Sequence, residues 1–357
     1  MKILVVGPSG TRSRGGMATV INGIQGSAVL NGRYDIDIFE SYIDGSLPVR
    51  LLYSLYAFLK FLFIYRKYDL FHIHTASFGS TFRKRLYLKV VKRAKKKAIV
   101  HIHGAKYLIF YGNLSEKRKK MVVDFLKSAD MVVALSDDWK EKFEKTFGLT
   151  NCVSLPNGID VEEFSEAVCP PEDHINSFLL LGRLGERKGV YDLINAVETA
   201  LKTNPELHVV LAGDGEIDKV KSLIAQKKLE SHIAVPGWVD PKGKIELLKK
   251  CSTVVLPSYN EGLPMSVLEG MASGKAIIST TVGAIPEVVK PENGILITPG
   301  DVKALSEALV KLSTDAKAVR QMSKANIEKI DAMFSMKRMH EKLSEYYDRA
   351  AGVAHTL

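Results

Sequence analysis

The chain has 357 residues, of which 46% are hydrophobic and 25% are charged, a profile typical of a globular protein with room for two domains of ordinary size. Its formal net charge of +10 favours an anionic partner, which can be nucleic acid, anionic lipid or an anionic substrate. The cysteines, Cys152, Cys169 and Cys251, have no paired spacing, so the sequence contains no zinc motif and indicates reduced thiols in a cytosolic protein.

The chain begins with a short apolar run that leads to Gly7, which predicts a first β-strand and not a signal peptide. Strand-like and helix-like segments then alternate, as in parallel sheets with crossover helices. The expected strands cover residues 3–6, 36–40, 70–74, 98–103 and 131–135 in the first half and 178–181, 208–212, 233–235, 253–256, 276–279 and 294–297 in the second. We therefore expect two Rossmann-like domains, over residues 1–165 and 172–334, with a linker within residues 162–175.

A glycine-rich loop, residues 7–18, connects the first strand to the first helix. Glycines at such a point let the backbone approach a ligand closely. The loop is longer than the tight Gly-x-Gly-x-x-Gly turn of dinucleotide-binding proteins, which argues against a nicotinamide dehydrogenase. Gly15 and Gly16 lie directly before the helix, and a plain turn is the alternative to a ligand-binding loop.

Two segments of the N-terminal half combine apolar and basic residues. Residues 51–65 are apolar and aromatic, interrupted mainly by Lys60, and are shorter than the ~20 residues that span a bilayer. Residues 83–97 have a helical apolar stripe among many lysines and arginines, which suits an anionic lipid surface. The alternative for both segments is an ordinary helix, packed on the sheet or solvated. The aromatic interleaving and the folds that bind nucleic acid are absent, so we expect no nucleic-acid partner.

The strand at residues 98–103 ends at His103, and Gly104 marks its end. The carboxyl edge of a parallel sheet is where open α/β folds bind ligands, so His103 is a candidate site residue. His72 and His74 lie on the preceding strand. We expect these two to be structural, because a histidine inside a strand usually finds a partner in the core.

The second domain opens with two basic residues, Arg183 and Lys188, in the loop after its first strand. Arg183 offers a planar fork of N–H donors, and Lys188 offers a point charge. Two cations aimed into a cleft between domains suit a diphosphate, and a surface charge pair is the alternative. Further along, Trp238 and Val239 follow a short strand, where Trp238 is either a pocket wall or a core residue.

The most informative stretch is residues 258–281. Pro264 suits the first turn of a helix, because its fixed φ fits there and its missing N–H is not needed. The apolar residues that follow have helical spacing, and Gly274 is a plausible stop. The loop before Pro264 therefore ends at a helix N-terminus, a site for an anion or a hydroxyl-rich ligand. Glu261 and Glu269 flank this point, and carboxylates bind phosphate poorly but accept hydrogen bonds from sugar or ribose hydroxyls.

The two glutamates, with seven residues between them and embedded in Glu-Gly-Leu-Pro and Glu-Gly-Met-Ala-Ser-Gly-Lys, resemble the paired-glutamate motif of retaining glycosyltransferases of family 4. The matching motifs run from Gly15 to Glu287 and are densest from Arg183 onward. The resemblance implies the α/β GT-B fold, in which two Rossmann-like domains face each other across a cleft. It also implies that the C-terminal helix, about residues 335–357, crosses back to the first domain.

The resemblance implies a role for each matching residue. Arg183 and Lys188 would stabilise the departing diphosphate, and Glu261 would hold the donor sugar. Glu269 would bind the ribose, and His103 would contact the sugar from the other domain. The further donor-binding positions are Gly15, Gly16, Val239, Gly262, Leu263, Pro264 and Met265.

We therefore expect a hexosyltransferase that moves a sugar from a nucleoside diphosphate sugar to a saccharide with retention of configuration. A UDP-sugar is favoured, and a GDP-sugar is the alternative. Asp35 and Asp37 form the Asp-x-Asp pattern that binds metal in the other large glycosyltransferase fold, but they enter a short strand here, so we expect strand-edge aspartates and no required metal.

The acceptor region, residues 41–97, is where the resemblance is weakest and the chain most basic and aromatic. It suggests a lipid-linked saccharide at the inner face of the plasma membrane, as in the assembly of bacterial surface polysaccharides. A nucleotide-sugar 2-epimerase and a non-catalytic, membrane-associated sugar-binding subunit are the alternatives. The paired-glutamate run argues against the epimerase, and the intact Arg183, Lys188, Glu261 and Glu269 argue against the subunit.

Overall fold

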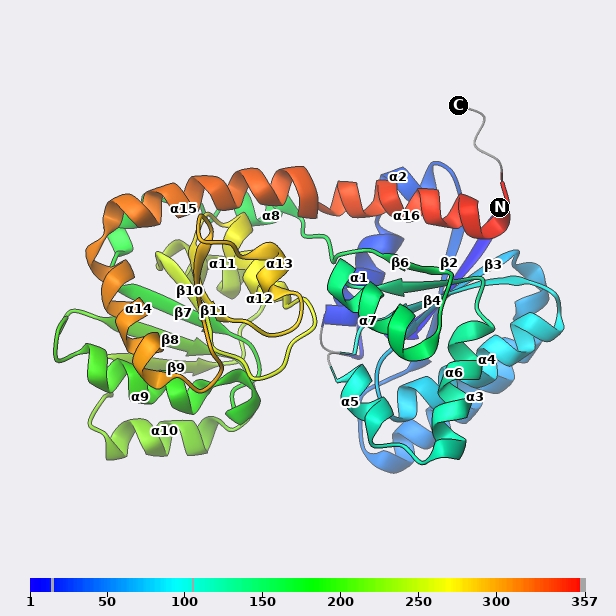
Figure 1. The fold of residues 1–357 in the computed structure, drawn as a ribbon, viewed down its shortest axis with the longest axis horizontal. Coiled ribbons are helices and arrows are strands. Elements are labelled where there is room, and N and C mark those ends of the chain that lie inside the picture. The colour runs from blue at the N-terminus through cyan, green and yellow to red at the C-terminus, as the bar shows by residue number, and fades with distance from the viewer. Residues whose placement is uncertain (14–15, 105, 354–357) are drawn as a thin grey trace. The chain divides into compact units, whose positions relative to one another are not determined.

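The computed structural model describes residues 1–13, 16–104 and 106–353. The chain forms two compact units, each built on its own six-stranded parallel sheet (Figure 1). The N-terminal unit consists of Met1–Gly158 together with Met336–Leu357, and the C-terminal unit consists of Ile159–Ser335. The structure is therefore of the α/β class, with the repeated strand–helix alternation that the sequence predicts.

The sheet of the N-terminal unit has the strand order β2-β1-β3-β4-β5-β6. Its strands are β1 (Lys2–Pro8), β2 (Asp35–Tyr42), β3 (Leu70–Thr75), β4 (Lys97–Ile102), β5 (Met131–Ala134) and β6 (Cys152–Ser154). The five expected strands are confirmed, and β6 was missed because a three-residue strand is too short to show a pattern. The helices of this unit are α1 (Gly16–Gln25), α2 (Ala28–Asn31), α3 (Leu47–Ile64), η1 (Tyr65–Lys67), α4 (Gly79–Arg93), α5 (Tyr107–Gly112), α6 (Glu116–Lys127), α7 (Asp137–Phe147) and α16 (Met336–Ala351).

The sheet of the C-terminal unit has the order β12-β11-β10-β7-β8-β9. Its strands, all six of them expected, are β7 (Ser177–Leu181), β8 (His208–Ala212), β9 (Ile233–Gly237), β10 (Thr253–Leu256), β11 (Ala276–Thr280) and β12 (Gly294–Ile297). The longer helices are α9 (Val190–Ala200), α10 (Ile217–Gln226), α11 (Pro241–Lys249), α12 (Met265–Ala272), α14 (Val302–Thr314) and α15 (Ala316–Lys329). The shorter ones are α8 (Val161–Ser165), η2 (Pro171–His174), η3 (Glu186–Lys188), α13 (Ile285–Val288) and the π-helical turn η4 (Ile330–Phe334).

The segment expected to be a linker, residues 162–175, is part of the C-terminal unit. It contains α8 and η2, and Asp160 caps α8 by accepting hydrogen bonds from the amides of Glu162 and Glu163. The division between the units falls earlier, after Gly158, and again after Ser335. Pro170 and Pro171 suggested a linker, but prolines at the start of a helical turn are equally favourable.

The strands of the N-terminal unit alternate their side chains between two cores. Leu4 and Val6 face a core that includes residues of α3, α4, α5, α6 and α7, whereas Ile3 and Val5 face a core formed with α1, α2 and α16. The last helix, α16, belongs to this unit, and its Tyr347 is fully buried there. This alternation with period two decides which strand side chains meet α16.

Helix α3 differs from the expectation that residues 51–65 are too short to span a bilayer. With η1 it runs over 21 residues, Leu47–Lys67, and among the described residues it is the one helix long and apolar enough to cross a membrane by length and composition. One side of it packs on the unit, since Ala57 and Phe61 are buried in the core. The other side leaves large apolar residues exposed, with Phe63 at 84% and Leu52 at 69%.

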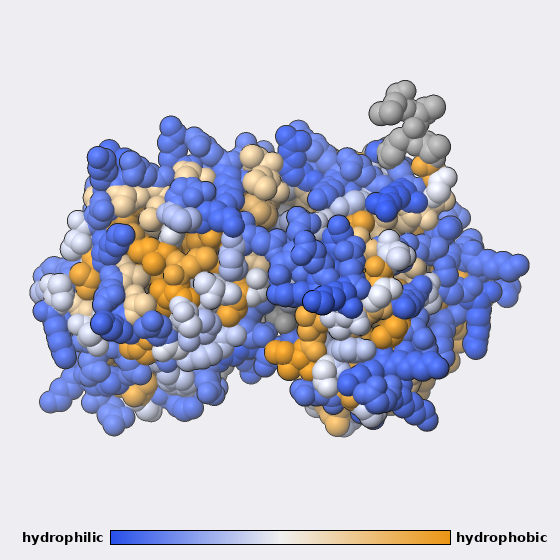
Figure 2. All heavy atoms as spheres, viewed as in Figure 1, coloured by the Kyte–Doolittle hydropathy of each residue, from blue (hydrophilic) through white to orange (hydrophobic). Residues whose placement is uncertain are grey.

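A second exposed apolar group lies near the carboxyl edge of the same sheet. Phe78 and Ile109 are 60% and 54% exposed, and the ring of Phe78 lies 5.2 Å from that of Phe110. Figure 2 shows hydrophobic residues at the surface near α5, one of several such patches on this face. Phe78 also has φ of 60°, a left-handed conformation that is uncommon for a bulky residue.

Candidate active site

The loop between β10 and α12 is held in place by the end of the neighbouring strand β11. Ser279 and Thr280, at the end of β11, donate hydrogen bonds to the carbonyls of Leu256 and Ser258 at 2.8 and 2.7 Å. Helix α12 begins at Met265 after Pro264 and ends before Gly274, which has φ of 65°. Both predicted ends of this helix are confirmed. The loop therefore leads from a buried strand to a helix N-terminus at the carboxyl edge of the sheet.

Two glycines let other chain segments press directly against this loop. A Cβ on Gly283 would lie 2.1 Å from the carbonyl oxygen of Glu261 and 2.5 Å from that of Gly262. A Cβ on Gly189 would lie 2.1 Å from the carbonyl oxygen of Pro257. Both glycines have positive φ, 58° and 68° respectively. The loop thus has a backbone packing that any side chain at either position would disturb.

Glu261 is buried and bound by two cations. Its Oε1 accepts from Lys188 Nζ at 2.9 Å and from Arg187 Nη1 at 3.0 Å. Arg187 also donates to the carbonyl of Asn260 at 3.0 Å, so it fixes the backbone next to the carboxylate. The structure therefore brings together Lys188 and Glu261, two residues that are 73 positions apart and that the sequence placed in one site.

Glu269 is the second buried carboxylate near the carboxyl edge of the C-terminal unit's sheet. It lies on α12, and its Oε1 accepts from Lys244 Nζ of α11 at 2.6 Å. Lys244 also lies over the ring of Phe164 at 5.6 Å from the centroid. Nearby Glu163 has a raised pKa, chiefly because of burial, with the charges of Asp160 and Glu269 adding to the effect and Lys244 opposing it.

Arg187 and Lys244 were missed at the sequence level. Arg187 is adjacent to Lys188, and the short helix η3 that carries both gave no periodic signal in three residues. Lys244 lies in a helix that has several other lysines, and only the tertiary contact with Glu269 distinguishes it. A buried carboxylate requires a partner, so each glutamate expected in the site could have prompted a search for a nearby cation.

The other expected donor-binding residues occupy the same sheet edge in different surroundings. Arg183 follows β7 and is exposed, and no described carboxylate forms an ion pair with it. Val239 is half-buried after β9, and the preceding Trp238 is 55% exposed, so it is not a core residue. The four positions Gly262, Leu263, Pro264 and Met265 follow Glu261 directly, and all but the half-buried Met265 are buried.

In the N-terminal unit, His103 lies just beyond β4, half-buried at the carboxyl edge of the sheet. Its Nε2 is 2.8 Å from Nδ1 of His74, and its backbone N–H donates to the carbonyl of Thr75. Burial lowers the pKa of His103 to about 3, so the imidazole is neutral at physiological pH. His101, two residues earlier, is 1% exposed, so His103 is the more accessible of the two histidines.

His72, His74 and His101 form a buried cluster behind His103. The period-two alternation of paired strands β3 and β4 places all of them on the side that faces α16. His72 contacts Tyr347 of α16 at 2.9 Å and His101 at 3.2 Å. Three of their nitrogens lie within 4.8 Å of one another, a spacing that could hold a metal ion. Each ring has at least one hydrogen-bonded nitrogen, whereas Nε2 of His74 and Nε2 of His101 are buried without a partner. The cluster fits a polar core network, as expected for His72 and His74.

Three further expectations concern the first strands. Gly16 is the first residue of α1 and is exposed, whereas Gly15 lies outside the described residues. Asp35 and Asp37 lie on β2 and form ion pairs with Lys2 at 3.2 and 3.6 Å. The Asp-x-Asp pattern is therefore a strand-edge feature of this unit.

Comparisons with known proteins agree with this architecture. The model of the family "Glycosyltransferase Family 4" matches residues 27–163, and that of "Glycosyl transferases group 1" matches residues 162–329. The chain is 28% identical over 321 residues to the UDP-Gal:alpha-D-GlcNAc-diphosphoundecaprenol alpha-1,3-galactosyltransferase of Escherichia coli, covering 84% of this chain and 79% of that protein.

Solved structures show the same fold at low identity. The sucrose-phosphate synthase of Thermosynechococcus elongatus matches with a TM-score of 0.80 and 18% identity, covering 99% of this chain and 100% of that one. HepE of Anabaena, in complex with UDP, matches with a TM-score of 0.79 and 19% identity, covering 98% and 100%. Taken with the two family models, which together extend from residue 27 to residue 329, these matches show that the chain belongs to glycosyltransferase family 4 and is a glycosyltransferase with the GT-B fold.

Proposed function

We propose that this glycosyltransferase moves a sugar from a UDP-sugar, with retention of configuration, to a lipid-linked saccharide during assembly of a bacterial surface polysaccharide. The observation that carries the proposal is the pair of buried carboxylates, Glu261 and Glu269, each bound by a cation at the carboxyl edge of one sheet. Buried carboxylates can accept hydrogen bonds from hydroxyls with geometric precision, and a nucleotide sugar presents hydroxyls on both its hexose and its ribose.

In this proposal Glu261 holds hydroxyls of the donor sugar and Glu269 holds the ribose. Lys188, Arg187 and Arg183 supply positive charge for the diphosphate, whose negative charge grows as the bond to the sugar breaks. Lys188 is buried and already oriented by Glu261, so it can stabilise the leaving group without first being desolvated. Arg183 is exposed and would close on the diphosphate when the donor binds.

The N-terminal unit contributes His103 and the backbone N–H of Gly16. Because His103 is neutral, it can donate or accept a hydrogen bond to the sugar but adds no charge beside the leaving group. The leaving phosphate would take the proton of the attacking hydroxyl on the same face, which gives retention. We propose that no metal is required, since Lys188 and Arg187, which flank Glu261, would supply the positive charge for the diphosphate.

The donor base is proposed from two comparisons. The similar galactosyltransferase of Escherichia coli is named for UDP-Gal, and the structurally similar HepE was solved with UDP. A GDP-sugar is the alternative donor. The same galactosyltransferase is named for a diphosphoundecaprenol acceptor, which supports a lipid-linked acceptor here.

A lipid-linked acceptor requires a membrane, and α3 offers a surface for one. With 3.6 residues per turn, seven exposed apolar side chains of this helix fall within about 140° of its circumference. They are Leu51, Leu52, Leu55, Tyr56, Leu59, Leu62 and Phe63. Phe61 on the opposite side contacts Phe71 and Tyr87 in the core, so α3 would lie in the plane of an anionic bilayer surface and not span it.

The test is a panel of UDP- and GDP-sugars, measured by thermal shift and slow donor hydrolysis with and without EDTA. A ligand that binds only the folded state raises the melting temperature. We expect a shift with UDP-sugars that EDTA does not change and that Glu269→Ala weakens, with Glu246→Ala on the exposed side of α11 as the control. Absence of any shift with every nucleotide, or a shift that EDTA abolishes, would contradict the proposal.

A further inference from the structure

Two arginines of the N-terminal unit lie over one tyrosine ring, and neither has been given a role above. The guanidinium carbon of Arg83 is 4.7 Å from the ring centroid of Tyr42, and that of Arg50 is 5.5 Å from it. Arg50 comes from the first turn of α3 and Arg83 from α4. Stacking on an aromatic face orients the planar guanidinium groups without using their N–H donors.

Neither arginine is neutralised within the described part of the chain. No ion pair with a described carboxylate is formed by either, and Arg50 Nε is buried without a hydrogen-bond partner. Glu40 of β2 is bound instead by Arg12 at 2.6 Å and by Ser9 at 2.5 Å. Burial lowers the pKa of Arg83, and the charge of Arg50 adds to this effect. Two arginines on one ring, neither in an ion pair and one with an orphaned donor, indicate a site for an anion.

The position of this group is set by the sheet. Tyr42 is the last residue of β2, where the register against β1 shifts so that Gly7 faces Glu40 and Pro8 faces Tyr42. Such irregularities re-aim a side chain at the end of a strand. The backbone N–H of Ser9, in the glycine-rich loop, donates to the carbonyl of Tyr42 at 2.8 Å. The arginines therefore lie at the same carboxyl edge as Ser9 and His103.

The arginines lie well away from His103, the residue proposed to contact the reacting sugar, along this edge of the sheet. Between β2 and β4 the order is β2-β1-β3-β4, and strands lie ~4.8 Å apart, so Tyr42 and His103 are roughly 14 Å apart along the edge. An anion at Arg50 and Arg83 is thus not positioned to be the leaving diphosphate. It is positioned at the far end of a molecule whose other end reaches His103.

Helix α3 indicates what else is attached to that anion. Arg50 is followed directly by the exposed apolar face that begins at Leu51 and Leu52. The N-terminus of α3 also adds its positive dipole, since Ser46 makes no side-chain cap. The surface therefore offers cations and, within one turn of α3, exposed apolar side chains. Such a surface suits a ligand in which a phosphate is joined to a hydrocarbon chain.

We propose that Arg50 and Arg83, stacked on Tyr42, bind the phosphate or diphosphate through which the acceptor saccharide is joined to its lipid. This assignment rests on the proposed lipid-linked acceptor and adds the place where its anion is recognised. The same chemistry is shared by the headgroups of anionic phospholipids, so the two sources have to be separated experimentally. The site would fix the acceptor so that its saccharide extends toward His103.

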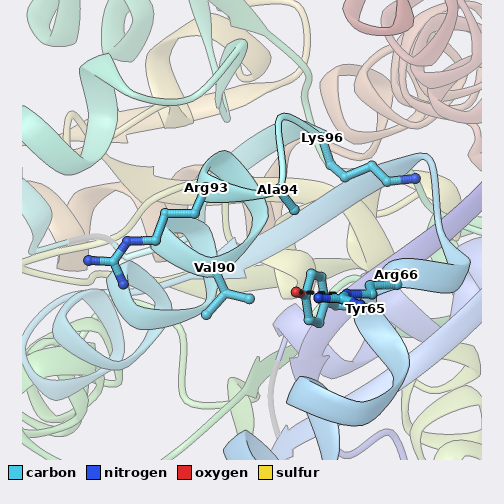
Figure 3. Close-up of a pocket in the computed structure, with 6 residues that line it drawn as sticks. All are labelled: Tyr65, Arg66, Val90, Arg93, Ala94 and Lys96. Carbon is cyan, nitrogen blue, oxygen red and sulfur yellow. Dashed lines mark hydrogen bonds between the residues drawn. The ribbon is translucent and has the colours of Figure 1, made fainter.

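A matched control lies at the opposite end of the same two helical segments. A groove there is lined by Tyr65, Arg66, Val90, Arg93, Ala94 and Lys96. Figure 3 shows Arg93 and Lys96 pointing in opposite directions, while Arg66 lies beside Tyr65 and donates to its hydroxyl at 3.3 Å. The groove is next to the amino-terminal end of β4, away from the substrate edge. Arg66→Gln with Arg93→Gln thus removes the same charge as Arg50→Gln with Arg83→Gln.

The experiment measures binding of decyl diphosphate by calorimetry, on the full chain saturated with UDP so that the nucleotide site is filled. We expect Arg50→Gln/Arg83→Gln to weaken this binding at least tenfold and the control pair to change it less than twofold. Equal affinity in all three proteins would overturn the assignment, as would an equal loss in both double variants, which would indicate general surface charge. Melting temperatures check that both variants fold.

A second arm separates the two sources of the phosphate. Co-sedimentation with phosphatidylglycerol vesicles is compared between the two double variants. Similar, modest losses in both variants, together with the selective loss of decyl diphosphate binding, support an acceptor site. A selective loss of vesicle binding in Arg50→Gln/Arg83→Gln, with decyl diphosphate binding retained, would overturn it in favour of a headgroup site. Because UDP binding is measured first in each protein, failure of the donor proposal is seen separately.

Discussion

Lys188 Nζ lies 2.9 Å from Oε1 of Glu261, and the two side chains are only 10% and 9% exposed. A buried ion pair of this kind adds little net stability, because desolvation of both charges offsets their attraction. Removing one partner is far more costly than removing both, because it leaves a buried charge without compensation. This asymmetry allows the structural and the catalytic contributions of the pair to be separated.

We expect Glu261→Ala to destabilise the C-terminal unit by about 3–5 kcal/mol. The double variant Lys188→Met/Glu261→Leu should recover most of that loss, since it removes both charges and fills the space. Neither variant should regain transfer, which should fall by about 10²–10³ in rate, because the leaving group loses its oriented cation. Chemical denaturation and transfer rates measure the two effects. A double variant that is as active as the native protein would show that the pair is purely structural.

For this pair, the sequence predicted the helix and the loop but not all of the side-chain contacts. The glutamate spacing and the adjacent Gly-Leu-Pro predicted the loop and α12, because helix start and stop signals are local. Lys188 was predicted to share the site, but the other partners of the carboxylates were not identified, since Arg187 and Lys244 come from other elements and are brought close only by the sheet order β11-β10-β7-β8-β9. Sequence patterns specify elements, and the pairing of distant side chains follows from how those elements stack.

The same distinction explains α3. Its apolar composition was evident, but residues 51–65 gave too short an estimate because Arg50 and Arg66 resemble boundaries, whereas the helix also includes Pro48 in its first turn. Proline is favourable in the first helical turn, so the helix begins at Leu47. The side of the helix that is exposed could not be deduced, since apolar residues occur around most of its circumference. Only the packing of Ala57 and Phe61 into the core decides it.

The buried histidines predict an acid-sensitive N-terminal unit. Burial lowers the pKa of His72 and of His103 to about 3, whereas an unfolded histidine has a pKa of about 6.5. Between these values the unfolded state binds more protons than the folded one, so stability rises with pH. Each histidine contributes up to about 1.4 kcal/mol per pH unit in that window and nothing above it.

We therefore expect the free energy of unfolding to be flat from pH 8 to about pH 6.5 and to fall below it. Denaturant titrations at a series of pH values measure the slope. His103→Asn should reduce the slope, because one of the buried imidazoles is then absent. Stability that stays constant down to pH 4 would show that these histidines are protonated in the folded protein, contrary to their burial.

The exposed side of α3 predicts binding to anionic bilayers that combines apolar and electrostatic contributions. We expect Leu55→Glu/Phe63→Glu to lower co-sedimentation with phosphatidylglycerol vesicles more than tenfold, because two large exposed apolar side chains become charged. Glu substitutions at Lys303 and Lys324, exposed lysines of the C-terminal unit, serve as the control. Equal binding to neutral and anionic vesicles, unaffected by salt, would remove the electrostatic part of the proposal.

Gly283 provides a prediction about the backbone of the donor loop. Its φ of 58° disfavours a side chain by about 1–2 kcal/mol, and a Cβ would also meet the carbonyl oxygen of Glu261 at 2.1 Å. Gly283→Ala should therefore displace the loop, lower the stability of the C-terminal unit and reduce donor affinity, even though no side chain of the site is changed. Gly112→Ala is the matched control, because a Cβ at that position has no neighbour within 4 Å. If thermal shift by UDP-sugars and transfer rate were unchanged in Gly283→Ala, the conformation of residues 261–263 could not be what determines donor binding.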